Sequence, residues 1–236
     1  MLGLIASIVL ASSGASAPDA GQSLLVLLDQ AIASERSRQL ALGPPKDVSE
    51  RLVRLGALDQ APRRVVTTFD FSKIPEAERA AVRAAVGQRI AAVDAETQAA
   101  LLALVPKEGW FLKSRYGEQA AQAAFLIVQH GPEGLVARFL PILEPLVAAG
   151  EVPGTDYAMM FDKVAILRDL PQRYGTQFRC DFGKWRPYPV EDPARLDERR
   201  AAVGYPGTFA TYRTVFEKMP PCAQTPRPPP PGMKFD

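Results

Sequence analysis

Apolar residues recur at intervals of three and four positions along most of this chain, with charged and amide residues between them. In the stretch from 22 to 41, for example, apolar residues lie among Gln, Asp, Glu and Arg; they are Leu24, Leu25, Leu27, Leu28, Ile32 and Leu40. A period near 3.6 residues is that of an amphipathic α-helix. The pattern predicts helices over residues 22–41, 47–68, 76–105, 117–130, 133–148 and 155–169, and shorter ones over 193–203 and 207–217.

Turn-forming residues separate these stretches. Gly131 and Pro132 directly follow the stretch 117–130, which is how a helix commonly ends. That stretch is nearly apolar, so we expect it to be a central helix. Asp94 lies within 76–105 and is a candidate N-cap that would divide this stretch into two helices; the alternative is one long helix.

The chain becomes irregular and aromatic after residue 170, and it ends in a proline-rich tail. No internal repeat of fixed period is present. We therefore predict a mostly α protein, with a single multi-helix domain over residues 20–218, an irregular C-terminal segment and a proline-rich tail over 219–236. The tail is expected to be a polyproline-type or disordered extension.

Composition narrows the classes of function. Of the 236 residues, 47% are hydrophobic and 23% are charged, and the net charge is only +2. A globular core is therefore available, and no electrostatic feature points to a nucleic acid as partner. The sequence contains no glycine-rich phosphate loop and no metal-ligand spacing, so we expect neither a cofactor nor a metal. It specifies no oligomeric state.

The N-terminus has the features of a secretory signal. Leu2–Leu10 is apolar but too short to span a bilayer, and Ser13–Ala15 and Ala15–Ala17 both fit small-residue cleavage sites. The initial region lacks Lys and Arg. We predict a signal peptide over residues 1–17 and export, either periplasmic or secreted. The alternative is a frayed apolar N-terminus on a cytoplasmic protein. No later segment is apolar enough to cross a membrane.

The two cysteines, Cys180 and Cys222, suit an oxidising compartment. If the chain is exported, a disulfide between them is the favoured interpretation, and it would tether the tail to the segment after residue 170. Two free thiols in a cytosolic protein are the alternative. A pair of cysteines and a distant histidine do not form a zinc site.

His130 is the only histidine of the chain and it ends the apolar stretch 117–130, beside Gln129. A histidine at this place can cap helix carbonyls, which is a purely structural role, or it can serve a site. Asp162 lies among apolar residues of the stretch 155–169, where a carboxylate needs a partner. That partner would be His130 or an arginine; alternatively, Asp162 faces solvent beside Lys163.

Two other stretches carry clustered polar groups. Asp59 and Arg63 stand four residues apart on one helical face, with Gln60 beside them, which is either part of a site or a surface ion pair. The segment PQRYGTQ at 171–177 crowds Gln172, Tyr174 and Gln177 around one glycine. We expect this turn to line a polar pocket together with His130, the alternative being a turn that docks through its own hydrogen bonds.

These motifs resemble those of a bacterial family of uncharacterised proteins, known only as a domain of unknown function. The similar elements are Asp-Gln-x-x-Arg at 59–63, Gly-Trp at 109–110, Gln-His at 129–130, Asp-Lys-Val at 162–164 and Gln-x-Tyr-Gly-Thr-Gln at 172–177. The resemblance covers about residues 45–206. It implies a polar site without implying a reaction. The site residues it implies are Asp59, Gln60, Arg63, Trp110, Gln129, His130, Asp162, Gln172, Tyr174 and Gln177.

Three functions fit these observations. The first is an exported binding protein whose pocket around His130 takes a small polar or amide-bearing ligand, either a small molecule or a peptide. The second is a hydrolase-like enzyme in which His130 is the general acid or base and Asp162 orients it. The third is a structural hydrogen-bond network without a ligand.

Overall fold

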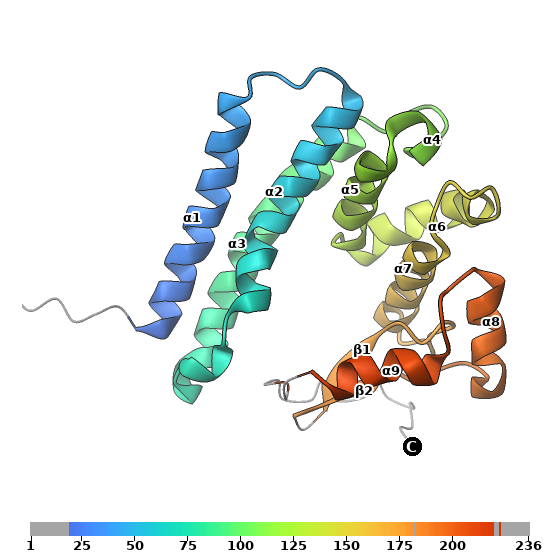
Figure 1. The fold of residues 1–236 in the computed structure, drawn as a ribbon. Helices are drawn as coiled ribbons and strands as arrows, with labels where there is room; N and C mark the ends of the chain where they lie inside the picture. Colours follow the sequence, from blue (N-terminus) through green and yellow to red (C-terminus); the bar gives the residue numbers. More distant parts are fainter. Residues whose placement is uncertain (1–18, 182, 220–221, 223–236) are drawn as a thin grey trace, which may run out of the picture.

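The computed structural model describes residues 19–181, 183–219 and 222, and the predicted mostly α architecture is confirmed there. Nine α-helices, two short 3-10 helices and one two-stranded sheet make up the described part of the chain (Figure 1). The signal peptide predicted over 1–17 and nearly all of the proline-rich tail lie outside the described residues. Among the described helices, none has the length and apolar character needed to cross a membrane.

Three long antiparallel helices form one side of the molecule (Figure 1). They are α1 (Ala20–Ala41), α2 (Val48–Thr68) and α3 (Glu76–Leu102), and the 3-10 helix η1 (Phe71–Lys73) lies between the last two. Asp19 and Asp47 cap α1 and α2 by accepting hydrogen bonds from backbone N–H groups. Helix α3 runs unbroken through Asp94, so the alternative in which Asp94 begins a new helix is wrong.

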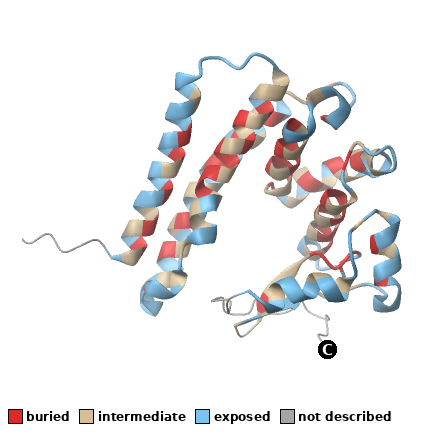
Figure 2. Ribbon diagram, viewed as in Figure 1, coloured by how far each residue is buried: buried red, intermediate tan, exposed pale blue. Residues whose placement is uncertain are grey.

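The centre of the molecule is built around α5 (Glu118–Gln129), which follows the single-turn helix α4 (Lys113–Tyr116). Half of the residues of α5 are buried, in keeping with its apolar sequence (Figure 2). Helices α6 (Glu133–Ala148) and α7 (Gly154–Leu167) pack beside it. Their apolar faces and that of α2 share one core with Trp110, Phe111 and Phe139.

The segment after residue 170 is more regular than expected. Strands β1 (Phe178–Asp181) and β2 (Lys184–Pro187) form an antiparallel hairpin in which Cys180 pairs with Trp185. The 3-10 helix η2 (Pro193–Arg195), α8 (Leu196–Ala202) and α9 (Phe209–Glu217) follow. No residue of α9 is buried; its Phe216 ring stacks on Phe178 at 3.7 Å between centroids. A disulfide joins Cys180 to Cys222 and so ties the chain beyond α9 to β1.

Candidate functional site

The candidate site lies where α2 and α5 approach each other most closely. Gly56 of α2 faces Ala123 of α5, and a Cβ atom at Gly56 would stand only 2.6 Å from the Ala123 Cβ. The missing side chain therefore allows the two helices to pack nearly backbone to backbone. About one turn further along α2 and two turns further along α5, Asp59 of α2 lies close to His130, which caps the C-terminal end of α5.

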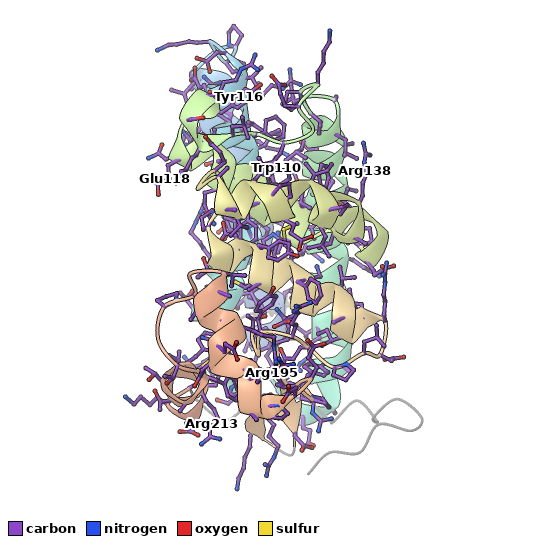
Figure 3. The ribbon with its side chains drawn as sticks, turned by 90° about the vertical axis from the view of Figure 1, so that its right-hand side faces the viewer. Trp110, Tyr116, Glu118, Arg138, Arg195 and Arg213 are labelled. Carbon is purple, nitrogen blue, oxygen red and sulfur yellow. A yellow bond between two sulfur atoms is a disulfide. The ribbon has the colours of Figure 1, made fainter. Side chains whose placement is uncertain are left out.

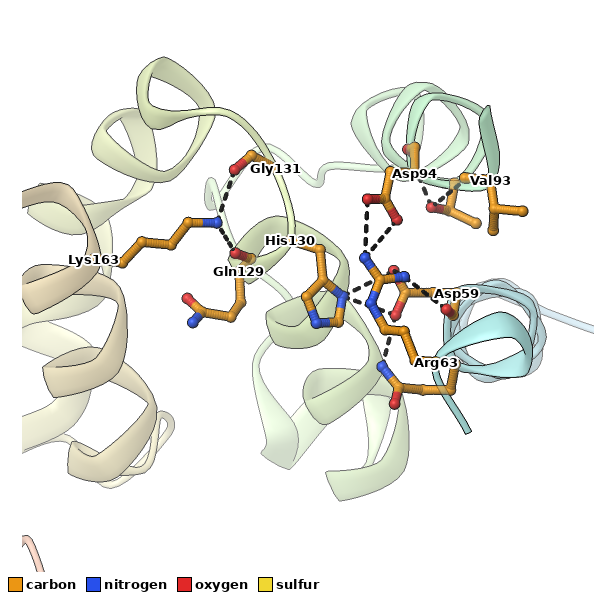
Figure 4. A network of polar contacts seen from close by, with 10 residues as sticks. Asp59, Arg63, Val93, Asp94, Gln129, His130, Gly131 and Lys163 are labelled. Carbon is orange, nitrogen blue, oxygen red and sulfur yellow. Dashed lines mark hydrogen bonds and ion pairs between the residues drawn. The ribbon is translucent and has the colours of Figure 1, made fainter. Parts of the chain in front are cut away.

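His130 and Asp59 form a close pair (Figure 4). The imidazole Nδ1 lies 3.0 Å from both carboxylate oxygens of Asp59. The Asp59 side chain is fully buried, whereas 23% of the His130 side chain is exposed. Because an ionised carboxylate can only accept hydrogen bonds, Nδ1 is the protonated nitrogen of this pair. Among the described residues Nε2 has no hydrogen-bond partner, so its lone pair is available to a ligand whenever the ring is neutral.

The buried carboxylate of Asp59 receives further donors. Gln60 Nε2 donates to Oδ2 at 2.7 Å and Arg63 Nη1 donates to Oδ1 at 3.2 Å. Arg63 also bridges to α3, because its Nη2 donates to both oxygens of Asp94 at 2.7 and 2.9 Å. The network thus joins α2, α3 and α5 and leaves no buried charge uncompensated.

Asp94 belongs to this network although the sequence analysis treated it only as a helix cap. Asp94 lies more than thirty positions from Asp59 and Arg63 along the chain, so no local sequence pattern links it to them. Such a partner could be found only by knowing which faces of α2 and α3 meet.

Lys163 of α7 holds the other side of the His130 segment (Figure 4). Its Nζ donates to the main-chain oxygen of Gln129 and, at 2.9 Å, to that of Gly131. Burial lowers the pKa of Lys163. The Oε1 atom of Gln129 is itself buried without a hydrogen-bond partner among the described residues. Lys163 was not predicted as a site residue from the sequence; a lysine inside an apolar helix was the available signal.

The expected pairing of His130 with Asp162 is wrong. Asp162 is fully buried, and its carboxylate accepts hydrogen bonds from the backbone N–H groups of Arg173, Tyr174 and Thr176 at 2.7–3.2 Å. The Thr176 hydroxyl donates a further bond at 2.9 Å. Burial raises the pKa of this carboxyl, and these donors oppose that shift. Asp162 therefore organises the turn after α7 and does not orient the imidazole.

The polar side chains of segment 171–177 form hydrogen bonds that fold the segment itself. The segment does not line a pocket with His130. Gln172 is fully buried; its Oε1 accepts from the backbone N–H of Gln177, and its Nε2 donates to the carbonyls of Gln177 and Tyr188. Tyr174 is buried against Tyr157 and Phe161. The structure thus divides the expected single constellation into a His130 network and a separate turn network.

The remaining residues of the turn network have structural contacts. Gln177 Nε2 lies 3.3 Å from the carbonyl oxygen of Met159. The Tyr174 carbonyl accepts a hydrogen bond from Arg200 Nη1 at 2.8 Å, and the Arg200 guanidinium stacks on Tyr205. Hydrogen bonds from both ends therefore secure the turn between α7 and α8.

Trp110 belongs to the hydrophobic core. Only 2% of Trp110, which is labelled in Figure 3, is exposed. Its ring packs edge-on against that of Phe139, with 5.2 Å between the ring centroids. Its contacts are with the core and not with either polar network, so its role is packing.

The described residues contain no cluster of three or more His, Cys, Asp or Glu side chains that would hold a metal ion. A hollow of about 650 Å³ lies between the end of α1 and α2, with Leu40, Arg51 and Leu55 among its lining, and His130 does not line it.

Fold and site together define a mostly helical protein with a histidine–carboxylate pair at a helix junction. The chain belongs to the family of unknown function DUF6624, whose sequence profile matches residues 46–219. Helix α1 lies before the matched region. No curated protein and no solved structure matches the chain.

Proposed function

We propose that this protein binds a small polar or amide-bearing ligand at His130, with imidazole Nε2 as the proton-accepting atom. One observation carries the proposal. Nδ1 is held by the fully buried Asp59, while Nε2 has no hydrogen-bond partner among the described residues and 23% of the His130 side chain is exposed. A structural cap would engage the ring with helix carbonyls, but here the main-chain oxygens beside His130 are served by Lys163.

The neighbouring groups fit this role. Asp59 fixes the tautomer that bears its proton on Nδ1 and stabilises positive charge when Nε2 takes a proton. Gln129, the last residue of the same helix, has a side-chain oxygen that is buried without a hydrogen-bond partner among the described residues. An amide or hydroxyl group of a ligand could donate to Nε2.

A second candidate function is general acid–base catalysis, for which the His130–Asp59 pair is the specific observation. An imidazole oriented through Nδ1 by a carboxylate can take a proton at Nε2 from water or substrate and return it to a leaving group. Hydrolysis by an activated water is the simplest reaction of this kind. The carboxylate in this role is Asp59, in place of the Asp162 expected from sequence.

The experiment uses the single histidine of the chain. A tag-free protein with isotope-labelled histidine gives imidazole NMR signals that belong to His130 alone. We expect wild-type protein to show a protonated Nδ1, and we expect a member of an amide, peptide and metabolite library to shift the Nε2 signal. Asp59→Asn should abolish the tautomer preference, and His130→Gln should abolish ligand-induced stabilisation in thermal melts.

Other results would count against binding. A His130 signal that no library member perturbs, combined with a loss of about 1–3 kcal/mol of unfolding free energy in His130→Gln, would make the network purely structural. Turnover of a library compound that stops in His130→Gln would favour the catalytic candidate instead.

We also propose that the protein is exported. The apolar run Leu2–Leu10 and the small residues after it support this, and the Cys180–Cys222 bridge suits an oxidising compartment. After expression of the full chain in a bacterium, periplasmic protein should begin at Ser16 or Pro18. Recovery only in the cytoplasm, beginning at Met1 or the next residue, would contradict export.

A further inference from the structure

Lys163 contacts the main chain on both sides of His130 without touching its ring. The two carbonyl oxygens that accept from Nζ belong to Gln129 and Gly131, the residues immediately before and after the histidine. Lys163 comes from α7, whereas the carboxylate that holds the ring comes from α2. The histidine is therefore held through its side chain by one helix and through its backbone by another (Figure 4).

This segment needs a donor from outside. The last carbonyl groups of an α-helix have no partner within the helix. The chain cannot supply a nearby N–H at position 132, because Pro132 has none. The backbone at Gly131 also has no room for a side chain, because a Cβ atom there would stand 2.6 Å from Leu135 Cδ2. The Lys163 ammonium fills this need with two hydrogen bonds.

We propose that Lys163 is the positioning residue of the His130 site. By fixing the Gln129–His130 and Gly131–Pro132 peptide groups, which flank the histidine, it sets the direction in which the ring leaves the backbone. That direction places Nδ1 3.0 Å from each of the two Asp59 oxygens and leaves Nε2 without a hydrogen-bond partner among the described residues. The inference rests on the proposed function, since it concerns how the same imidazole is presented to a ligand.

A lysine that only stabilised the helix end would predict something different. Its removal would lower the melting temperature but leave the preferred tautomer and the Nδ1 contact of His130 unchanged in the folded molecules. A positioning residue changes the state of the imidazole within the folded protein. The two roles therefore separate in a measurement made on His130 itself.

The test compares four variants of the full chain by NMR of the His130 imidazole. Lys163→Met removes the donors at similar side-chain length, Lys163→Gln reaches less far, and Lys163→Arg restores charge and donors. Arg168→Met is the matched control, because it removes a cation at the end of the same helix that pairs with Glu133. The readouts are the tautomer and the solvent exchange of the Nδ1 proton.

We expect Lys163→Met to speed exchange of the Nδ1 proton by about tenfold or more and to populate the Nε2-protonated tautomer. Lys163→Gln should fall between Lys163→Met and wild type, and it carries the test if Lys163→Met does not fold. Lys163→Arg and Arg168→Met should stay close to wild type. Unchanged exchange and tautomer in folded Lys163→Met, or in folded Lys163→Gln if that variant carries the test, would overturn the positioning role.

The proposed function fails in a distinguishable way. If wild-type protein and Asp59→Asn give the same tautomer and the same exchange, Asp59 does not hold the imidazole, and both proposals are overturned together. If wild type shows the Asp59-dependent state and a ligand shifts Nε2, but Lys163→Met behaves like wild type, only the role of Lys163 is lost.

Discussion

At the scale of single residues, three buried carboxylates of this protein differ in what compensates their charge. Asp59 is served by imidazole, amide and guanidinium donors, and Asp162 by backbone N–H groups. Asp156, in the first turn of α7, is 8% exposed and has one weak partner, the Thr155 hydroxyl at 3.4 Å. Burial accordingly raises the pKa of Asp156 to about 6.

This makes the stability of the protein depend on pH through Asp156. In the unfolded chain the carboxyl has its ordinary pKa, 3.8. Between about pH 4 and pH 6 the folded state therefore binds more protons than the unfolded state, and the free energy of unfolding falls as the pH rises. Asp156→Asn should remove this penalty and raise the free energy of unfolding by about 1–3 kcal/mol at pH 8, but by little near pH 4.

Urea unfolding of both proteins at the two pH values measures the effect. Asp169→Asn, which neutralises an exposed carboxylate just after α7, controls for the change in net charge. The interpretation would be wrong if Asp156→Asn had the same effect on unfolding at pH 4 as at pH 8, because the difference would then arise from packing.

At the scale of secondary-structure elements, the contact between α2 and α5 determines whether the candidate site forms. Gly56→Ala gains about 1 kcal/mol of helix propensity, but its new methyl group meets Ala123 at 2.6 Å. Overpacking of that kind costs about 1–3 kcal/mol, so we expect net destabilisation. Because the helices must separate, the hydrogen bond between His130 and Asp59 should also weaken.

Gly87→Ala in α3 is the matched control, since a Cβ atom there meets nothing within 4 Å. It should raise the free energy of unfolding by about 0.5–1 kcal/mol. Urea unfolding and the Nδ1 proton signal of His130 report the two effects. Stabilisation by Gly56→Ala equal to that by Gly87→Ala would show that α2 and α5 have room to adjust.

The same scale explains what the sequence could and could not predict. The long helices follow from periodic apolar residues, and the observed ends lie within a few residues of those expected, as for α5 before Gly131. The hairpin of β1 and β2 was missed because strands of four residues are too short to show alternation. The structure places Asp59 beside His130, whereas the sequence left Asp162 as a possible partner of the imidazole.

That error arises because a helical pattern identifies an apolar face without identifying the helix it meets. Asp162 and Asp59 are both carboxylates on partly apolar helices, and only the packing of α2 against α5 distinguishes them as partners of His130. The segment 171–177 was misplaced for a related reason. Its polar groups form hydrogen bonds with Asp162 and with one another. The sequence of such a turn does not differ from that of a turn whose polar groups are free to line a site.

At the scale of the whole molecule, the C-terminal region is held to the helical body by few buried contacts. Most of α8 and α9 is exposed (Figure 2), and α9 has no buried residue. The fully buried Arg200 of α8 donates to the Tyr174 carbonyl, whereas α9 is attached through the stack of Phe216 on Phe178 and the disulfide beyond it. We therefore expect the bridge to contribute strongly to the stability of this region.

The double variant Cys180→Ser, Cys222→Ser tests this expectation. The cysteines are 42 positions apart, and closing a loop of that length in the unfolded chain is worth about 4 kcal/mol in the chain-entropy description. We expect a loss of about 2–4 kcal/mol in urea unfolding. Amide hydrogen exchange should become faster in α9, because the disulfide no longer restrains the local opening of this weakly buried helix. Exchange in α5 should change little.

Wild-type protein reduced before measurement should behave like the double variant. Equal protection of α9 in both proteins, with an unchanged free energy of unfolding, would mean that the aromatic stack alone anchors the region.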